Sequence, residues 1–191
     1  MYWEDVGYLL SRNNFDENSI IMEAFTLGHG KCSGIVYGGS SRKNKKIFQI
    51  GNKILINYKS KNQNKMGYFS IELIKPVSPK YFDDKKRSIC ILAATSILKI
   101  LLPDHQINKS IYNSFENLLN KLNSDDWIKL YISWEIKLIK ELGFESDVKI
   151  NQNDDTRKAL SFNRNLLMEN FIIPNRLKFP LFRNILENYF L

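Results

Sequence analysis

The segment 38–46 brings together residue types that bind phosphate. Two glycines and two serines open it, and four cations follow within five positions: Arg42, Lys43, Lys45 and Lys46. Cationic side chains displace the counterions of a nucleic-acid backbone, and short hydroxyl and amide groups reach its oxygens. We therefore predict that this segment binds nucleic acid. On composition alone, a solvated loop without a ligand remains the alternative.

A second basic stretch lies in the next predicted hairpin and contains Lys59, Lys61 and Lys65, with amide side chains at residues 62–64. Two basic loops on one small barrel would border a single groove, and such grooves bind single strands by combining cations with stacked aromatic rings. Most aromatic residues in strands fill cores, but five in the neighbouring apolar runs are candidates for stacking: Tyr8, Tyr37, Tyr58, Tyr68 and Phe69.

One predicted helix, over residues 124–143, carries a carboxylate on its apolar face. At about 100° per residue, Glu135 falls in the middle of an apolar arc. The arc consists of Ile128, Tyr131, Ile132, Leu138, Ile139 and Leu142. Because a buried carboxylate is costly unless it is paired, we interpret Glu135 as a structural residue in an ion pair or cap, not a catalytic one. The opposite arc holds Lys129, Ser133, Lys137 and Lys140, which simple solvation would explain.

The sequence contains no complete catalytic constellation. A nucleophile elbow, a Walker-type loop, a dinucleotide fingerprint and a zinc-protease motif are all absent, so we predict a non-enzymatic protein without a cofactor. His29 lies between two glycines and is interpreted as a turn residue, of a type that tolerates left-handed backbone geometry. Cys32 and Cys90 lack metal-ligand spacing, so we predict two buried thiols and no metal site.

The elements that must position these residues fall into two parts. In the first 75 or so residues, apolar or alternating runs at 6–10, 20–25, 35–37, 54–58 and 68–74 alternate with turn signals. Five short strands favour a small Greek-key barrel. The OB-fold is the commonest such barrel, and an SH3-like barrel is its competitor.

The periodicity becomes helical after Pro76 and Pro79. The expected helices cover 83–102, which Pro103 ends; 109–122; 124–143, with Ser124 as N-cap and Gly143 after the last turn; a stretch ending near Pro174; and 180–190. The predicted fold class is α+β, with an OB-fold barrel over residues 1–78 and an all-helical domain over residues 79–191.

The formal net charge is +8, and its distribution is more informative than its size. Residues 1–80 carry 12 basic and 6 acidic side chains, whereas residues 81–191 carry 16 and 14. Codon bias would spread lysines evenly, so the asymmetry favours an acidic partner at the first part. We expect a cytoplasmic protein, because no apolar run approaches the roughly 20 residues of a membrane span and the acidic start is unlike a signal peptide.

Several segments resemble the bacterial RecO family in order and spacing. They are Asp5–Arg12, Phe25-Thr26 with His29-Gly30-Lys31, Gly38-Gly39 with Arg42, Gln49–Gly51, the helix Tyr131–Phe144, and the tail from Leu160 through Phe171, Pro174 and Pro180. The resemblance covers nearly the whole chain and implies an N-terminal OB-fold followed by a helical domain. It also implies that Lys31 belongs to the DNA-binding set.

The resemblance further implies a recombination mediator. Such a protein binds single- and double-stranded DNA, anneals complementary strands, contacts the C-terminal tail of single-stranded DNA-binding protein (SSB), and loads recombinase with RecR, with RecF as a further candidate partner.

The sequence departs from the family pattern at two places. Residues 145–158 form a short linker without cysteine where the family often has a zinc-binding insert, so no zinc is expected. Ser133 replaces an arginine of many relatives, so the contact with the acidic SSB tail is either weaker in this chain or made by Lys129, Lys137 and Lys140.

Two other functions stay open on the residues alone. One is a generic OB-type module that binds single-stranded nucleic acid or RNA and uses its helices for another partner. The other is a structural adaptor with incidental basic loops. Acceleration of strand annealing would distinguish a recombination mediator from these two functions.

Overall fold

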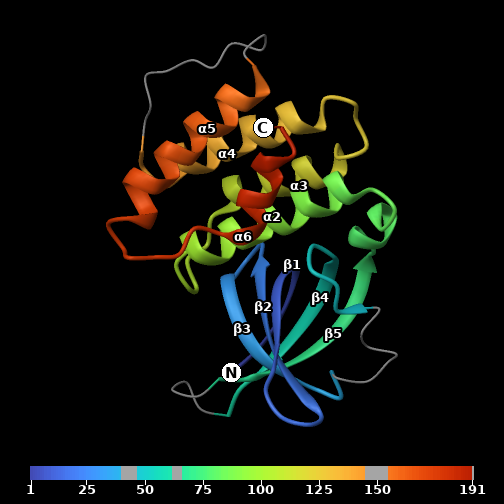
Figure 1. The fold of residues 1–191 in the computed structure, drawn as a ribbon. Coiled ribbons are helices and arrows are strands. Elements are labelled where there is room, and N and C mark those ends of the chain that lie inside the picture. The colour runs from blue at the N-terminus through green and yellow to red at the C-terminus, as the bar shows by residue number, and fades with distance from the viewer. Residues whose placement is uncertain (40–46, 62–65, 145–154, 191) are drawn as a thin grey trace.

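The chain forms a β-barrel with a layer of helices packed over one end (Figure 1). The computed structural model describes residues 1–39, 47–61, 66–144 and 155–190. Within these residues the barrel has five strands: β1 (Tyr2–Asn14), β2 (Ser19–Thr26), β3 (Gly30–Tyr37), β4 (Lys53–Lys59) and β5 (Tyr68–Lys75). All five predicted strands are therefore confirmed, and β1 is longer than its apolar run.

The strands close in the order β1-β2-β3-β5-β4. Strand β1 is antiparallel to both β2 and β4, and β4 is antiparallel to β5. Strands β3 and β5 run parallel where Ile35 lies opposite Tyr68, and the Ile35 amide donates to the Gly67 carbonyl at 2.9 Å. This parallel closure is typical of the OB-fold and not of an all-antiparallel SH3-like barrel. The predicted fold class is confirmed.

Strand β1 contributes to two hydrophobic cores. Because side chains alternate along a strand, Leu9 points into the barrel beside Met22, whereas Tyr8 and Leu10 face the helices. The register between β1 and β2 shifts between Leu9 and Ser11, a bulge that bends the strand. One apolar core therefore continues from the barrel wall into the helical layer.

Five α-helices follow the barrel in the described part of the chain: α2 (Lys85–Leu101), α3 (Lys109–Asn120), α4 (Trp127–Glu141), α5 (Thr156–Leu167) and α6 (Leu181–Asn188). A short 3-10 helix (Ser78–Tyr81) precedes them, and a π-helix (Met168–Ile172) extends α5. Helix α2 ends before Pro103 as predicted. Gly143 has φ +96° after α4 and its amide donates to Lys140 O at 2.9 Å, which confirms its predicted position after the last turn.

The starts of α4 and α5 differ from the prediction. Ser124 is not the N-cap of α4, because the chain forms a further turn in which the Ser124 hydroxyl accepts a hydrogen bond from the Asp126 amide at 3.3 Å. The helix begins at Trp127, whose indole is buried beside Phe190. Helix α5 begins at Thr156, with Asp155 accepting from the Arg157 amide at 3.1 Å. Residues 156–158 are thus helical and not part of the linker.

Candidate nucleic-acid interface

Both predicted basic loops connect to the seam between β3 and β5. Arg42, Lys43, Lys45 and Lys46 lie in 40–46 and Lys65 in 62–65, outside the described residues. The chain leaves β3 at Tyr37, shortly before the first basic segment, and enters β5 at Tyr68, shortly after the second. Because β3 and β5 are paired there, the strand that precedes the first loop lies beside the strand that follows the second.

Two stacked tyrosines mark this seam. The rings of Tyr37 and Tyr68 lie 5.0 Å apart between centroids at an interplanar angle of 16°, and the side chains are 65% and 43% exposed. A hydrogen bond between the two residues raises the pKa of the Tyr37 hydroxyl. Lys59, which lies opposite Tyr68 in the sheet, is exposed, and so is Lys61 two positions further along the chain. The seam therefore combines flat aromatic surface with positive charge.

Buried residues of the barrel flank the segment 40–46 in the sequence. Before it, Gly39 is buried so closely that a Cβ atom would lie 2.4 Å from Cγ1 of Ile20. After it, Phe48 is 3% exposed and belongs to the barrel core.

The other aromatic candidates are unavailable for stacking on DNA. Tyr8 is 1% exposed between the barrel and α3, and Phe69 is 4% exposed inside the barrel. Tyr58 is half-buried and stacks on Trp3 at 4.8 Å between ring centroids. Of the five candidates, therefore, only Tyr37 and Tyr68 present broad faces to solvent. The sequence cannot separate them, because alternation places aromatic rings on both sides of each strand.

Lys31 is held inside the protein. Its ammonium donates to the Lys99 carbonyl at 2.9 Å and lies 3.2 Å from Oδ1 of Asp104, and its side chain is 12% exposed. The charge therefore links β3 to the end of α2 and to the connection that follows it. This arrangement suits Lys31 to joining the two parts of the chain better than to contacting phosphate.

His29 lies in the turn between β2 and β3, as predicted, but its own backbone is not left-handed. The left-handed geometry falls to Gly30, which has φ +69°. The imidazole instead stacks on Trp3 at 4.1 Å, and its Nδ1 lies 2.9 Å from Oδ2 of Asp5. Burial opposes ionisation of Asp5, but hydrogen bonds from His29 and the Gly28 amide outweigh it and lower the pKa of this carboxyl group. These contacts join the turn between β2 and β3 to the first residues of β1.

Helix α4 has the two faces that its sequence indicates. Lys129, Ser133, Lys137 and Lys140 are exposed, whereas Glu135 is fully buried. The Glu135 carboxylate accepts from Arg183 of α6 at 2.6 Å and 3.1 Å, and further hydrogen bonds come from Tyr131 at 2.9 Å and Asn163 at 3.0 Å. Glu135 thus lies in a buried ion pair whose partner is 48 positions away in the sequence.

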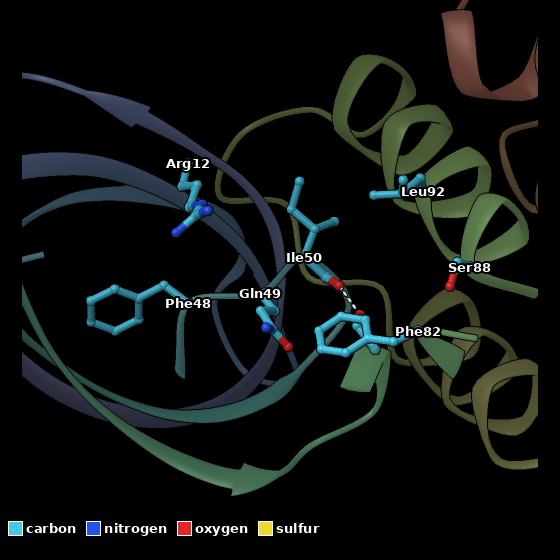
Figure 2. Close-up of a pocket in the computed structure, with 8 residues that line it drawn as sticks. Arg12, Phe48, Gln49, Ile50, Phe82, Ser88 and Leu92 are labelled. Carbon is cyan, nitrogen blue, oxygen red and sulfur yellow. Dashed lines mark hydrogen bonds between the residues drawn. The ribbon is translucent and has the colours of Figure 1, made fainter. Parts of the chain in front are cut away.

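An open pocket of about 250 Å³ lies where the barrel meets α2. Its lining residues are Arg12, Phe48, Gln49, Ile50, Ser78, Phe82, Ser88 and Leu92. Figure 2 shows Arg12, Phe48 and Gln49 on the barrel side, Ser88 and Leu92 on α2, and Phe82 between the two sides. Sequence reasoning did not single out this pocket, because three separate segments build it.

The comparisons with known proteins agree with this architecture. Residues 1–77 match the family model described as Recombination protein O N terminal, and residues 83–150 match Recombination protein O C terminal. The DNA repair protein RecO of Cereibacter sphaeroides is 31% identical over 162 residues, which are 85% of this chain and 67% of that protein. The chain belongs to the RecO family.

Two further RecO proteins show the same relationship. That of Wolbachia pipientis from Culex pipiens is 30% identical over 150 residues, which are 78% of this chain and 61% of that protein. That of Ehrlichia chaffeensis is 30% identical over 164 residues, with shares of 85% and 66%. Membership of the RecO family gives the chain a role in DNA repair and recombination.

Two negative findings apply to the part of the chain that the structure describes. No helix there is both long enough and apolar enough to cross a membrane. The same residues contain no group of three or more His, Cys, Asp or Glu side chains placed to hold a metal ion. Cys32 and Cys90 are free and buried, as predicted.

Proposed function

We propose that this RecO-family chain is a non-enzymatic recombination mediator that acts in the cytoplasm. It binds single- and double-stranded DNA, anneals complementary strands, and helps RecR to load recombinase on SSB-coated DNA. The observation that carries the proposal is the β3–β5 seam, where the exposed rings of Tyr37 and Tyr68 are stacked and which follows or precedes each basic segment in the sequence. Cations with exposed aromatic rings are the combination that holds single strands without sequence preference.

The proposal assigns different partners to the two parts of the chain. Residues 1–78 act as the DNA-binding domain through Arg42, Lys43, Lys45 and Lys46, together with Lys59, Lys61 and Lys65. Residues 79–191 act as the partner-binding domain. Lys31 contributes to the first part by holding β3 in place, since its ammonium already has two partners within the protein.

The exposed face of α4 is the proposed site for the acidic SSB tail. Lys137 and Lys140 are exposed, and Lys129 lies 3.3 Å from Asp126 in an ion pair whose side chains are 56% and 69% exposed. Exposed pairs of this kind contribute little energy, so an acidic peptide can displace Asp126 at small cost. The charge of these three lysines is therefore available to a partner.

Reversal of four charges in the first basic loop tests the DNA-binding assignment. We expect Arg42, Lys43, Lys45 and Lys46, all changed to Glu, to weaken DNA binding by several kcal/mol at low salt, because each lost phosphate contact also removes counterion release. The slope of log affinity against log salt concentration is negative, and its magnitude should decrease by about 3 to 4. Fluorescence anisotropy with a labelled oligonucleotide at several salt concentrations measures both quantities.

A matched variant controls for net charge. Lys85, Lys109, Lys121 and Lys158 are exposed on the helices, and their change to Glu alters the net charge equally. This control should keep most of the wild-type affinity and salt slope. An equal loss of DNA affinity in the two variants would show a long-range effect of net charge and would contradict the assignment of DNA binding to the loop.

An annealing assay separates mediation from simple binding. We expect the wild-type chain to accelerate pairing of complementary strands coated with SSB. We expect the variant with Lys129, Lys137 and Lys140 changed to Glu to lose this acceleration while keeping its affinity for naked DNA. Binding of single strands without acceleration by the wild-type chain would favour the generic single-strand or RNA-binding module instead.

A further inference from the structure

Gln49, which lines the pocket between the barrel and α2, carries a hydrogen-bond acceptor without a donor. Oε1 of Gln49 is buried and has no hydrogen-bond partner among the described residues. The two pocket hydroxyls already donate within the protein, Ser78 to the Ile50 carbonyl and Ser88 to the Tyr81 carbonyl. A buried acceptor without a donor is destabilising, so a ligand with an N–H group gains a favourable site there.

The rest of the pocket has apolar walls and one cation. Phe82 is 64% exposed although it is a large aromatic residue, and Ile50 and Leu92 add aliphatic surface. Arg12, an exposed residue of β1, lines the barrel side (Figure 2). At about 30 Å³ per water molecule, the pocket volume corresponds to about eight waters, roughly the number of heavy atoms in a nucleobase.

We propose that this pocket holds one unpaired base of a bound single DNA strand. This rests on the proposed DNA-binding function and adds a subsite to it. The base stacks on Phe82, an N–H group on its pairing edge donates to Gln49, and the adjoining phosphate approaches Arg12. Unstacked bases are recognised in this way, by aromatic stacking together with hydrogen bonds to their free edges.

The position of the pocket in the chain agrees with this ligand. Gln49 is three residues beyond Lys46, so at most about 11 Å of chain separates the pocket from the predicted phosphate-binding segment. A duplex does not fit the requirement, because its pairing edges are occupied and its bases are stacked on both faces. An apolar side chain of an acidic peptide would fill the walls but leave Gln49 without a donor.

The test compares two oligonucleotides of equal length, one carrying thymine bases and one made only of abasic sites. Their backbone charge is the same, so the ratio of their affinities measures the contribution of the bases. We expect the wild-type chain to prefer the base-containing strand. Phe82→Ala and Gln49→Met should each reduce this preference about fivefold or more, while affinity for the abasic strand and for duplex DNA stays unchanged.

Two further measurements make the outcome decisive. Gln49→Met should keep or raise the melting temperature, because it removes an unsatisfied buried acceptor; a purely structural glutamine would show a fall. Phe144→Ala, which removes an exposed ring from the end of α4, is the matched control and should leave the preference intact. If both pocket variants keep the wild-type preference, the base subsite is overturned while DNA binding by the loops stands. If the wild-type chain binds neither strand, the proposed function itself fails.

Discussion

At the scale of single residues, the largest concentration of buried charge surrounds Glu135. Arg183 and Glu135 are both fully buried, and the guanidinium also reaches Glu187 at 3.1 Å and the Leu160 carbonyl at 2.8 Å. Burial by itself would lower the pKa of Arg183, but the adjacent Glu135 carboxylate raises it. The ion pair ties α6 to α4 and α5 in the interior of the helical layer.

Removal of one partner should be far more costly than removal of both. We expect Arg183→Leu to lower the free energy of unfolding by about 3 to 5 kcal/mol, because it leaves the Glu135 carboxylate buried without a cation. The double variant Arg183→Leu with Glu135→Leu should recover part of this loss. Urea unfolding followed by circular dichroism measures the two values, with the exposed Arg157→Leu as control. A double variant less stable than the single one would contradict this explanation.

At the scale of elements, one residue of α3 fastens the helical layer to two strands of the barrel. Oε1 of Glu116 lies 2.5 Å from the Lys53 ammonium in β4 and accepts from the Tyr8 hydroxyl in β1 at 2.9 Å. Burial opposes its ionisation, yet the hydrogen bonds from Lys53 and Tyr8 prevail and lower the pKa of Glu116 below 4.5. The ionised carboxylate is therefore the form that joins the two layers.

The stabilising effect of Glu116 should depend on pH with a definite sign. Its pKa is lower in the folded chain than in the unfolded chain, so its contribution is fully present above about pH 4.5 and is lost as pH falls through the folded value. We expect Glu116→Gln to cost about 1 to 2 kcal/mol at pH 7 and almost nothing at the acid end of the transition.

Urea unfolding of the Glu116→Gln variant and the wild-type chain across this pH range provides the measurement. The exposed Glu169→Gln is a control that removes a carboxylate without these partners. A stability difference that stays constant from neutral to acid pH would show that the ionised carboxylate is not what joins α3 to the barrel.

At the scale of the whole molecule, the barrel and the helices share a core. Tyr8, Leu10 and Phe25 of the barrel belong to the same apolar cluster as the buried residues of α2, α3 and α4. Tyr8 and Phe25 pack on Tyr112, with ring centroids 5.6 Å and 5.7 Å apart. Neither part can be separated without exposing these rings to water, a cost that favours unfolding as one unit.

Tryptophan fluorescence can follow the two parts separately. Trp3 lies in the barrel, whereas Trp127 and Trp134 lie in α4. One variant keeps Trp3 as its only tryptophan, and the other carries Trp3→Phe. In each variant, we expect the urea midpoint of the fluorescence change to equal the midpoint of the circular dichroism change. Two distinct midpoints within one variant would instead show that residues 1–78 and 79–191 are independent domains.

The sequence by itself determined the elements and much of the family resemblance. Periods of two and 3.6 residues gave the strands and helices, and the same helical period placed Glu135 on the buried face of α4. Such patterns report which side of an element meets an apolar surface, and that is a local property. The five stacking candidates were equivalent at this level, because alternation does not say which face of a strand is covered.

Only the tertiary structure decided which partners these residues have. It covered Tyr8 and Phe69, left Tyr37 and Tyr68 exposed, and gave Lys31 two partners near α2. It also brought Arg183 to Glu135, and it assembled the pocket of Arg12, Gln49 and Phe82 from three segments. These contacts join residues far apart in the chain. They depend on how whole elements pack together, and no local period records that packing.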